Sequence, residues 1–284
     1  MIKNICSIRG VRYIASGLLL TVSLLSTSLG IQASSFVDSA VLQNTALRGE
    51  SAQRDIYRHP SETLAFFGVE SNMTVVEVWP GGGWYTEVLA PHLAAGKLYA
   101  AHFPRDSAIP YLVKSRHFFE KKMQASAAAY SNVTLSEFNP DRAMLSVPDG
   151  SADRVLTFRN VHNWLRNKSE AQAFRLFFKA LKPGGVLGLV EHRAKPNTDW
   201  DTMAESGYMT EAYVIALAEK AGFVLEAKSD INANSKDSAN HPKGVWSLPP
   251  SFRMGKTDRA HYRAIGESDR MTLRFKKPET MDGK

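Results

Sequence analysis

Residues 74–86 read TVVEVWPGGGWYT, and this stretch decides how the rest of the chain is interpreted. Residues 74–79 are mostly β-branched or aromatic and predict a buried strand. Gly81, Gly82 and Gly83 follow, before a helical pattern. Glycines directly after a strand let the backbone turn sharply and approach a ligand, and the next helix directs free N–H groups towards it. We therefore predict the first unit of a nucleotide-binding α/β domain. The alternative is a tight turn that holds no ligand.

A charged residue lies inside the predicted strand. Glu77 stands between Val76 and Val78, and taking a carboxylate out of water costs several kcal/mol unless it is given partners. This cost favours a ligand-binding loop over a bare turn, and it makes Glu77 a candidate ligand-binding residue.

Strands and helices alternate along most of the chain. The predicted strands are residues 74–79, 97–102, 133–138, 153–158, 186–191, 223–228 and 270–275. The predicted helices are residues 39–48, 61–67, 85–93, 111–130, 169–181 and 210–221. The alternation predicts an α/β fold with a seven-stranded, mainly parallel sheet that helices cover on both faces.

The same pattern predicts a single domain at residues 34–284. We expect it to begin with a helical extension at residues 34–70 and to contain a long polar insertion at residues 229–268, before the last strand. A loop of that length in one domain is usually a lid, a binding loop or an interface arm.

The N-terminus has the pattern of a signal peptide. Lys3, Arg9 and Arg12 are basic, residues 14–29 are mostly apolar, and a small residue ends the run. The apolar run is shorter than the roughly twenty residues that a membrane-spanning helix needs. We therefore expect residues 1–33 to be cleaved, and the mature protein to be periplasmic or secreted with no stable membrane span. An uncleaved anchor is the alternative.

Charge and cysteine content narrow the choice of partners. The formal net charge is +7, and the positive charges are spread along the sequence. Nucleic-acid-binding domains usually concentrate basic residues on one face, so we expect no nucleic-acid partner. The only cysteine, Cys6, lies in the predicted leader, and a mature chain without cysteine suits an oxidising compartment.

Three stretches resemble the class I S-adenosylmethionine-dependent methyltransferases. Residues 75–86 are similar to motif I of that family, an acidic residue followed by glycines. Residues 148–156, PDGSADRVL, resemble the approach to its fourth strand, and residues 181–187, LKPGGVL, the entry to its fifth. The sequences of residues 79–85 and 159–164 resemble those of a group of bacterial predicted methyltransferases, many of which carry leader peptides.

The resemblance implies S-adenosylmethionine as the cofactor and a Rossmann-like methyltransferase sheet with strand order 3-2-1-4-5-7-6, the last strand antiparallel. It also implies that motif I and the ends of strands two and four hold the cofactor. The residues at these positions are Glu77, Pro80, Gly81, Gly82, Gly83, Tyr85, His102 and Asn160. Asn160 is also a candidate cap for the helix that follows it.

Two positions depart from the family's pattern. Trp79 stands where motif I has its first glycine, so the backbone near the methionine part of the cofactor is expected to be rearranged. The second strand ends at His102, where the family usually has an acid that holds both ribose hydroxyls, and Asp106 is the candidate replacement. A nicotinamide-dependent oxidoreductase is a weaker alternative, because Thr86 stands at the third glycine of that motif and the same acid is missing.

Titratable side chains are expected to gather at the ends of strands four and five, where ligands bind in open parallel sheets. His162 is the candidate general base, since an imidazole can accept a proton from an O–H or N–H nucleophile. A structural or substrate-orienting role is the alternative. Glu191 and His192 are the other catalytic candidates, but adjacent strand residues face opposite ways, so only one should easily enter the pocket. These three could form a metal site, although no local ligand spacing predicts one.

Other side chains are weaker candidates. Tyr208 and Glu211 could line the substrate side, although both also suit the start of a helix. Tryptophans could form an aromatic wall around a sulfonium ion or an apolar substrate, or could belong to the core. They are Trp79, Trp84, Trp164 and Trp246.

These features predict an exported S-adenosylmethionine-dependent methyltransferase that acts on a small-molecule substrate. S-adenosylmethionine is made in the cytoplasm, so the predicted export conflicts with the cofactor that the predicted fold would need. The alternative is therefore an exported protein that binds another small ligand in the same crevice without catalysis.

Overall fold

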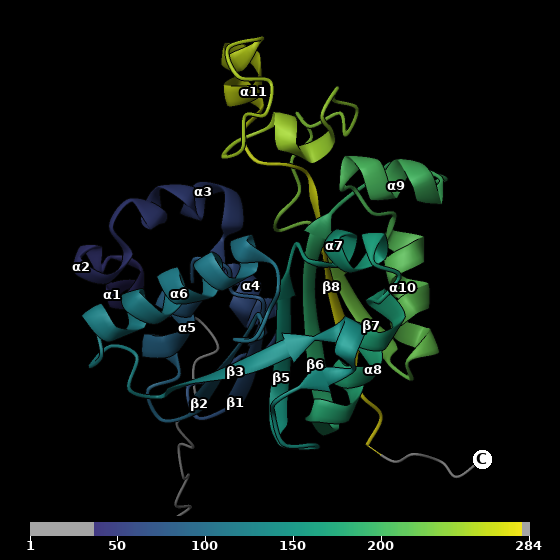
Figure 1. Cartoon of the computed structure of the whole chain (residues 1–284). Coiled ribbons are helices and arrows are strands. Elements are labelled where there is room, and N and C mark those ends of the chain that lie inside the picture. Colours follow the sequence, from purple (N-terminus) through teal and green to yellow (C-terminus); the bar gives the residue numbers. More distant parts are fainter. Residues whose placement is uncertain (1–36, 280–284) are drawn as a thin grey trace, which may run out of the picture. The chain divides into compact units, whose positions relative to one another are not determined.

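A mixed sheet of eight strands runs through residues 37–279, which this computed structural model describes (Figure 1). The strands are β1 (Thr74–Val78), β2 (Lys97–His102), β3 (Val133–Asn139), β4 (Met144–Leu145), β5 (Ala152–Phe158), β6 (Leu181–His192), β7 (Val224–Ser229) and β8 (Arg270–Lys276). Their order across the sheet is β4-β3-β2-β1-β5-β6-β8-β7. The predicted α/β class is confirmed.

The short strand β4 corrects the predicted count of seven strands and the order 3-2-1-4-5-7-6. Met144 and Leu145 pair antiparallel with β3 and add an eighth strand at the edge of the sheet. Two residues are too few to show the alternating pattern from which a strand is predicted. β8 runs antiparallel to both β6 and β7, as expected for the last strand.

Helices lie on both faces of the sheet (Figure 1). They are α1 (Ser39–Leu42), α2 (Thr45–Arg48), α3 (Asp55–Arg58), α4 (Pro60–Phe66), α5 (Thr86–His92), α6 (Pro110–Ala125), α7 (Val161–Arg166), α8 (Glu170–Ala180), α9 (Trp200–Ser206), α10 (Glu211–Lys220) and α11 (Arg259–Ile265), with 3-10 turns η1 (Gly49–Arg54), η2 (Pro140–Arg142) and η3 (Gly244–Ser247). Helices α4, α5 and α6 cover one face, and α7, α8 and α10 the other. None of the helices in this part of the chain is both long and apolar enough to cross a membrane.

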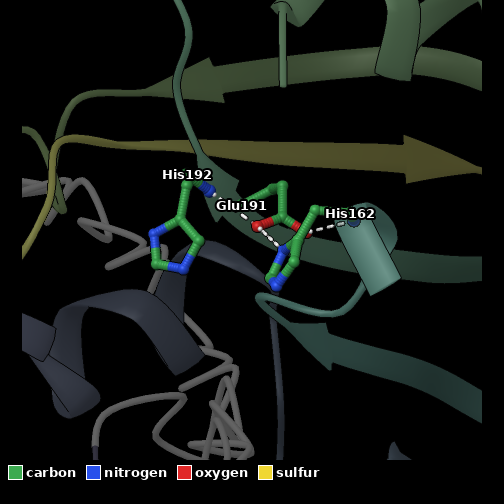
Figure 2. Close-up of side chains that lie close together, drawn as sticks. All are labelled: His162, Glu191 and His192. Atoms are coloured by element: carbon green, nitrogen blue, oxygen red, sulfur yellow. Dashed lines mark hydrogen bonds and ion pairs between the residues drawn. The ribbon is translucent and has the colours of Figure 1, made fainter. Parts of the chain in front are cut away.

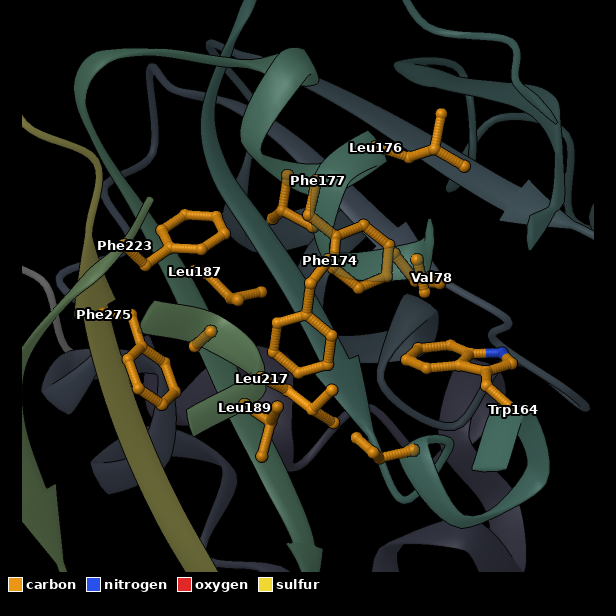
Figure 3. Packing of buried hydrophobic residues seen from close by; sticks show 14 of the residues in the cluster. Val78, Trp164, Phe174, Leu176, Phe177, Leu187, Leu189, Leu217, Phe223 and Phe275 are labelled. Carbon is orange, nitrogen blue, oxygen red and sulfur yellow. The ribbon is translucent and has the colours of Figure 1, made fainter. Parts of the chain in front are cut away.

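The larger hydrophobic core lies between the sheet and helices α8 and α10 (Figure 3). Phe174 and Phe177 of α8 are fully buried in one cluster with Leu187 and Leu189 of β6. Their spacing of three residues places the two phenylalanines on one face of the helix. Burying each such side chain contributes about 1.5–3 kcal/mol. This core holds β5 and β6 in place, and the candidate site is built from their ends.

Two segments outside the alternating pattern meet beside the sheet. The helix predicted at residues 39–48 is divided into α1 and α2, because the side chain of Asn44 caps a new helix there. The insertion before β8 contains η3 and α11. Arg58, from the segment before β1, donates from Nε to Glu267, from the insertion, at 3.3 Å. The predicted signal peptide at residues 1–33 lies outside the described residues.

Candidate functional site

The loop between β1 and α5 requires glycine at two of its three glycine positions. Gly81 and Gly83 have φ values of +58° and +82°, which other residues rarely adopt. At Gly83 an added Cβ would lie 2.9 Å from the ring of Phe119, whereas at Gly81 it would meet nothing within 4 Å. Gly83 therefore fits the loop against α6, and Gly81 leaves its backbone open to a ligand.

A cavity of about 360 Å³, the first cavity, lies at this loop. Its lining includes several predicted cofactor-binding residues, which are Glu77, Pro80, Gly81, Gly82, Tyr85 and Asn160. The lining is completed by Ser51, Arg54, Arg58, Trp79, Trp84, Phe158 and Arg159. Two of the predicted cofactor-binding residues, Gly83 and His102, do not line it.

Glu77 is buried beside the first cavity with a single side-chain partner. The hydroxyl of Thr86 donates to its Oε2 at 2.6 Å. Burial raises the pKa of Glu77 to about 7, and the hydrogen bond from Thr86 offsets only part of this rise. A cation in the cavity would favour the charged carboxylate. Glu77 can therefore respond to the charge of whatever occupies the first cavity.

Trp79 adopts a backbone conformation that usually belongs to glycine. Its φ is +47°, which costs a residue with a side chain about 1–3 kcal/mol. The indole packs on Phe103, Phe138 and Trp164, and its Nε1 donates to the carbonyl oxygen of Phe138 at 3.0 Å. These contacts hold the strained residue at the edge of the first cavity. The chain thus keeps a left-handed turn although the glycine of the family's pattern is replaced.

His102 supports the glycine loop instead of lining the cavity. Its Nδ1 accepts the backbone N–H of Phe103 at 2.8 Å, so Nε2 carries the proton and donates to the carbonyl oxygen of Gly81 at 3.1 Å. Burial lowers the pKa of His102 to about 4, which keeps the ring neutral. Asp106, the candidate replacement for the missing acid, also lies outside the cavity, where it is exposed and paired with Arg142 at 2.7 Å.

Asn160 ties the ends of β1 and β5 together at the first cavity. Its Nδ2 donates to the carbonyl oxygen of Val78 at 3.0 Å and to Oγ1 of Thr157 at 3.2 Å. It occupies the cap position of α7, but its side chain makes no capping hydrogen bond. Its amide nitrogen is therefore used by the protein, and its amide oxygen is the atom left for a ligand.

A second cavity, of about 250 Å³, adjoins the first. Arg54, Arg58 and Arg159 line both cavities. The rest of the second lining is His162, His192, Val245, Trp246, Pro249, Pro250, Ser251, Glu267, Ser268 and Arg270. The insertion therefore supplies one wall. Both cavities lie beyond the carboxyl ends of β1, β5 and β6, where ligands bind in open α/β sheets.

His162 and Glu191 form a buried hydrogen-bonded pair beside the second cavity (Figure 2). Nδ1 of His162 lies 3.0 Å from Oε1 of Glu191, which also accepts the backbone N–H of His192 at 2.8 Å. Oε2 accepts the backbone N–H of Val161 at 2.6 Å. Because an ionised carboxylate only accepts, Nδ1 carries the ring proton and Nε2 remains an acceptor. Glu191 thus orients His162 for proton acceptance.

His192 lines the second cavity, whereas Glu191 is fully buried and does not. Nδ1 of His192 lies 2.5 Å from Oγ of Ser268. Burial, together with the nearby His162, lowers the pKa of His192 well below its ordinary value, so its ring is neutral. Candidate ligand atoms of His162, Glu191 and His192 lie within 4.8 Å of one another. Both oxygens of Glu191 already accept hydrogen bonds, which leaves little capacity for a metal ion.

An arginine cluster surrounds one carboxylate in the second cavity. Its members are Arg54, Arg58, Arg159 and Arg270. Glu267 accepts from Nε of Arg54 at 2.5 Å, from Nε of Arg58 at 3.3 Å and from Nη2 of Arg270 at 2.5 Å. Burial works to raise the pKa of Glu267, but the arginines outweigh it and lower the pKa to about 2.

The arginine cluster is not predicted from the sequence. Arg54 and Arg58 lie in the segment before β1, and Arg270 begins β8, so each one alone resembles an ordinary surface charge. Only Arg159 carried a signal, because it directly follows β5 at the edge where ligands are expected.

The weaker candidates are divided between the cavities and the core. Tyr208 and Glu211 line neither cavity, and the hydroxyl of Tyr208 donates to Asp237 at 2.9 Å. Trp164 is fully buried in the larger core, whereas Trp246 lines the second cavity. Of the four tryptophans considered for an aromatic wall, Trp164 therefore belongs to the core and the other three line the cavities.

Comparison with known proteins establishes the fold. No family model and no curated protein matches the chain. An S-adenosylmethionine-dependent methyltransferase from Aquifex aeolicus is 18% identical, with a TM-score of 0.51 over 63% of this chain and 87% of that chain. A candidate sarcosine dimethylglycine methyltransferase from Galdieria sulphuraria is 15% identical, with a TM-score of 0.55 over 82% and 88%. A candidate methyltransferase from Bacillus halodurans is 17% identical, with a TM-score of 0.50 over 78% and 99%. This chain thus has the fold of the class I S-adenosylmethionine-dependent methyltransferases.

Proposed function

We propose that this protein transfers the methyl group of S-adenosylmethionine to a small nucleophilic substrate. One observation carries the proposal: a glycine-loop cavity adjoins a second cavity in which His162 is held with Nε2 as an acceptor. The likeness to solved methyltransferases supports it through the fold.

The first cavity has features that suit this cofactor. Gly81 leaves its backbone open, Asn160 retains its amide oxygen for a ligand, and the buried carboxylate of Glu77 would be stabilised by a nearby cation. When bound, S-adenosylmethionine would supply an electrophilic methyl group on a positively charged sulfur.

The side chains of the second cavity would prepare the nucleophile. His162 would accept the proton of a substrate hydroxyl or amine at Nε2, while Glu191 keeps the proton on Nδ1 and stabilises the cation that forms. The neutral ring of His192 avoids a second positive charge beside that cation. The rest of the rate enhancement would come from holding the two reactants in adjacent cavities.

A second candidate function is binding of another small ligand without catalysis. The observation that favours it is the end of β2, where His102 is neutral and uses both ring nitrogens within the protein. No carboxylate from this strand end reaches the first cavity to hold ribose hydroxyls. This candidate keeps the glycine loop and both cavities but needs no base.

Export is a separate proposal that rests on the sequence of residues 1–33. We expect the mature chain in the periplasm or the medium of a bacterial host that expresses the full sequence. Cell fractionation followed by N-terminal sequencing checks this expectation. Recovery of the uncleaved chain in the cytoplasm would contradict it.

Calorimetric titration tests the methyltransferase proposal directly. S-adenosylmethionine and S-adenosylhomocysteine should bind the full chain, whereas NAD should not. Gly82→Asp should abolish this binding without unfolding the chain, because Gly82 has an ordinary backbone conformation and an added Cβ would meet only Phe118, at 3.9 Å. Gly82→Ala is the matched control and should retain most of the affinity. If neither compound binds a folded chain, the methyltransferase proposal fails, and binding of another small ligand without catalysis becomes the favoured function.

A further inference from the structure

The second cavity has a charge pattern that points to the class of its ligand. Four arginines line it, and Glu267 is the one carboxylate among the described residues of its lining. A low-dielectric cavity lined by one sign of charge attracts and orients ions of the other sign. Arginine is especially suited to carboxylates and phosphates, which its planar group can bind through two parallel hydrogen bonds.

Two members of the arginine cluster have their donors satisfied by the protein or by water. Arg270 donates to Glu267 at 2.5 Å, to Oγ of Ser268 at 3.3 Å and to the carbonyl oxygen of Tyr57 at 3.2 Å. Arg54 donates from Nε to Glu267 at 2.5 Å, and its side chain is 31% exposed, so water can bind its Nη atoms. These two arginines therefore neutralise Glu267 and join the insertion to the segment before β1.

The other two members keep donors for a ligand. Arg58 is 2% exposed and uses Nε for Glu267, but within residues 37–279 its Nη atoms form no hydrogen bond. The guanidinium group of Arg159 forms neither a hydrogen bond nor an ion pair within the same residues. Both groups line the second cavity, so these donors are available to a ligand there.

Two features of Arg159 cost the folded chain free energy. Its φ is +62°, a left-handed conformation that costs a non-glycine residue about 1–3 kcal/mol. Burial and the nearby Arg270 lower the pKa of Arg159 to about 10, so the group stays charged at neutral pH although its surroundings oppose the charge. A bound anion would offset the repulsion between Arg159 and the neighbouring arginines.

We propose that the second cavity binds a small anion that also carries the nucleophile to be methylated. Its carboxylate or phosphate group binds Arg159 and the Nη atoms of Arg58, and its hydroxyl or amine lies at Nε2 of His162. Trp246 and the prolines at 249–250 form an apolar wall for the body of the molecule. This inference rests on the methyltransferase function proposed above, because it takes His162 as the base.

A competing assignment arises because Arg58 and Arg159 line both cavities. They could instead bind the carboxylate of the cofactor itself. The two assignments differ in one measurable respect. A substrate anion and the cofactor product S-adenosylhomocysteine would bind together in the first case and would exclude each other in the second.

The experiment titrates the full chain with benzoate, phenyl phosphate and benzamide, with and without saturating S-adenosylhomocysteine. The three probes share an aromatic ring and differ in charge and anion type. At least one anion should bind about tenfold or more tightly than benzamide, with or without S-adenosylhomocysteine. The preference between benzoate and phenyl phosphate identifies the natural anion as a carboxylate or a phosphate.

A matched pair of variants locates the binding. Arg159→Gln should weaken anion binding about tenfold or more without lowering the melting temperature, since it removes no hydrogen bond or ion pair within the described residues. Arg159→Lys keeps the charge and should lose less affinity. Arg175→Gln removes the same charge from the exposed surface of α8 and should leave anion binding unchanged.

Two outcomes would overturn the inference. One is equal binding of the anions and benzamide, and the other is displacement of the anions by S-adenosylhomocysteine. S-adenosylhomocysteine is also titrated alone. If it does not bind while the anions do, the proposed function fails but the anion site remains.

Discussion

The two cavities each contain a buried glutamate, and the pKa values of the two carboxylates are shifted in opposite directions. Glu77 in the first cavity has a pKa raised to about 7, and Glu267 in the second has a pKa lowered to about 2. Their burial is similar, but their neighbours differ. Glu77 accepts from one neutral hydroxyl, whereas three guanidinium groups surround Glu267. Glu77 would therefore be stabilised by a cation in the first cavity, although three arginines also line that cavity. Glu267 is already neutralised by its arginines, so the second cavity stays positively charged.

Removing the charge of Glu267 should have the largest effect on stability. Glu267→Gln would leave the arginine cluster without its counter-ion in a buried site, which should lower the free energy of unfolding by about 3–5 kcal/mol. Urea unfolding at neutral pH measures this loss. Glu279→Gln, which removes an exposed partner of Lys276, is the control and should cost no more than about 1 kcal/mol. If the two variants lost the same free energy of unfolding, Glu267 would not be the buried counter-ion that distinguishes the second cavity from the first.

Removing the charge of Glu77 should stabilise the folded chain above neutral pH. The folded pKa of Glu77, about 7, exceeds its ordinary value of 4.5, so its charge costs nothing below pH 4.5 and destabilises the fold increasingly as pH rises towards 7. Glu77→Gln should therefore raise the free energy of unfolding by about 2–3 kcal/mol at pH 8. At pH 4 the unfolding curve of Glu77→Gln should almost match that of the original chain. A variant less stable than the original chain at pH 8 would contradict the raised pKa of Glu77.

The same linkage predicts the opposite pH window for Glu267. Its folded pKa is below the ordinary value, so its contribution to stability is complete above pH 4.5 and is lost as pH falls towards 2. A pH series of unfolding curves for Glu267→Gln should therefore approach the series for the original chain only at the acidic end. If the difference in free energy of unfolding between the variant and the original chain were the same at every pH, the lowered pKa of Glu267 would be contradicted.

The smallest effect is expected for a substitution of Asp106. This substitution tests whether Asp106 takes part in ligand binding in the first cavity. Asp106 is exposed and paired with Arg142 outside that cavity. Asp106→Asn should change both the stability and the affinity for S-adenosylhomocysteine by no more than about 0.5 kcal/mol. A tenfold loss of affinity would instead make Asp106 the acid that holds the ribose.

Local patterns were sufficient to predict most of the fold. The strand from Lys97 to His102 has the predicted bounds, because its apolar run is bounded by turn residues. β6 begins at Leu181, earlier than predicted, since its Pro-Gly-Gly sequence suggests a turn and its pairing with Ala152 depends on a distant segment. β4 is too short to leave any pattern in the sequence.

The candidate site could be predicted only where it follows strand ends. Topology alone predicts that His162, Glu191 and His192 lie at one edge of the sheet, and in the structure they lie together. The hydrogen bonds that Glu191 makes to His162 and Val161 could not be predicted in this way. The arginine cluster depends on contacts between residues more than two hundred positions apart, such as Arg58 and Glu267. No local spacing in the sequence carries that information.

The shared wall of Arg54, Arg58 and Arg159 has a consequence for the order of events in turnover. An anion in the second cavity would offset part of the positive potential that opposes a sulfonium ion in the first, so each ligand would raise the affinity of the other by the same factor. The two sites would then fill cooperatively. Once methyl transfer has removed the sulfonium charge, this mutual attraction would disappear, and the loss would favour release of the products.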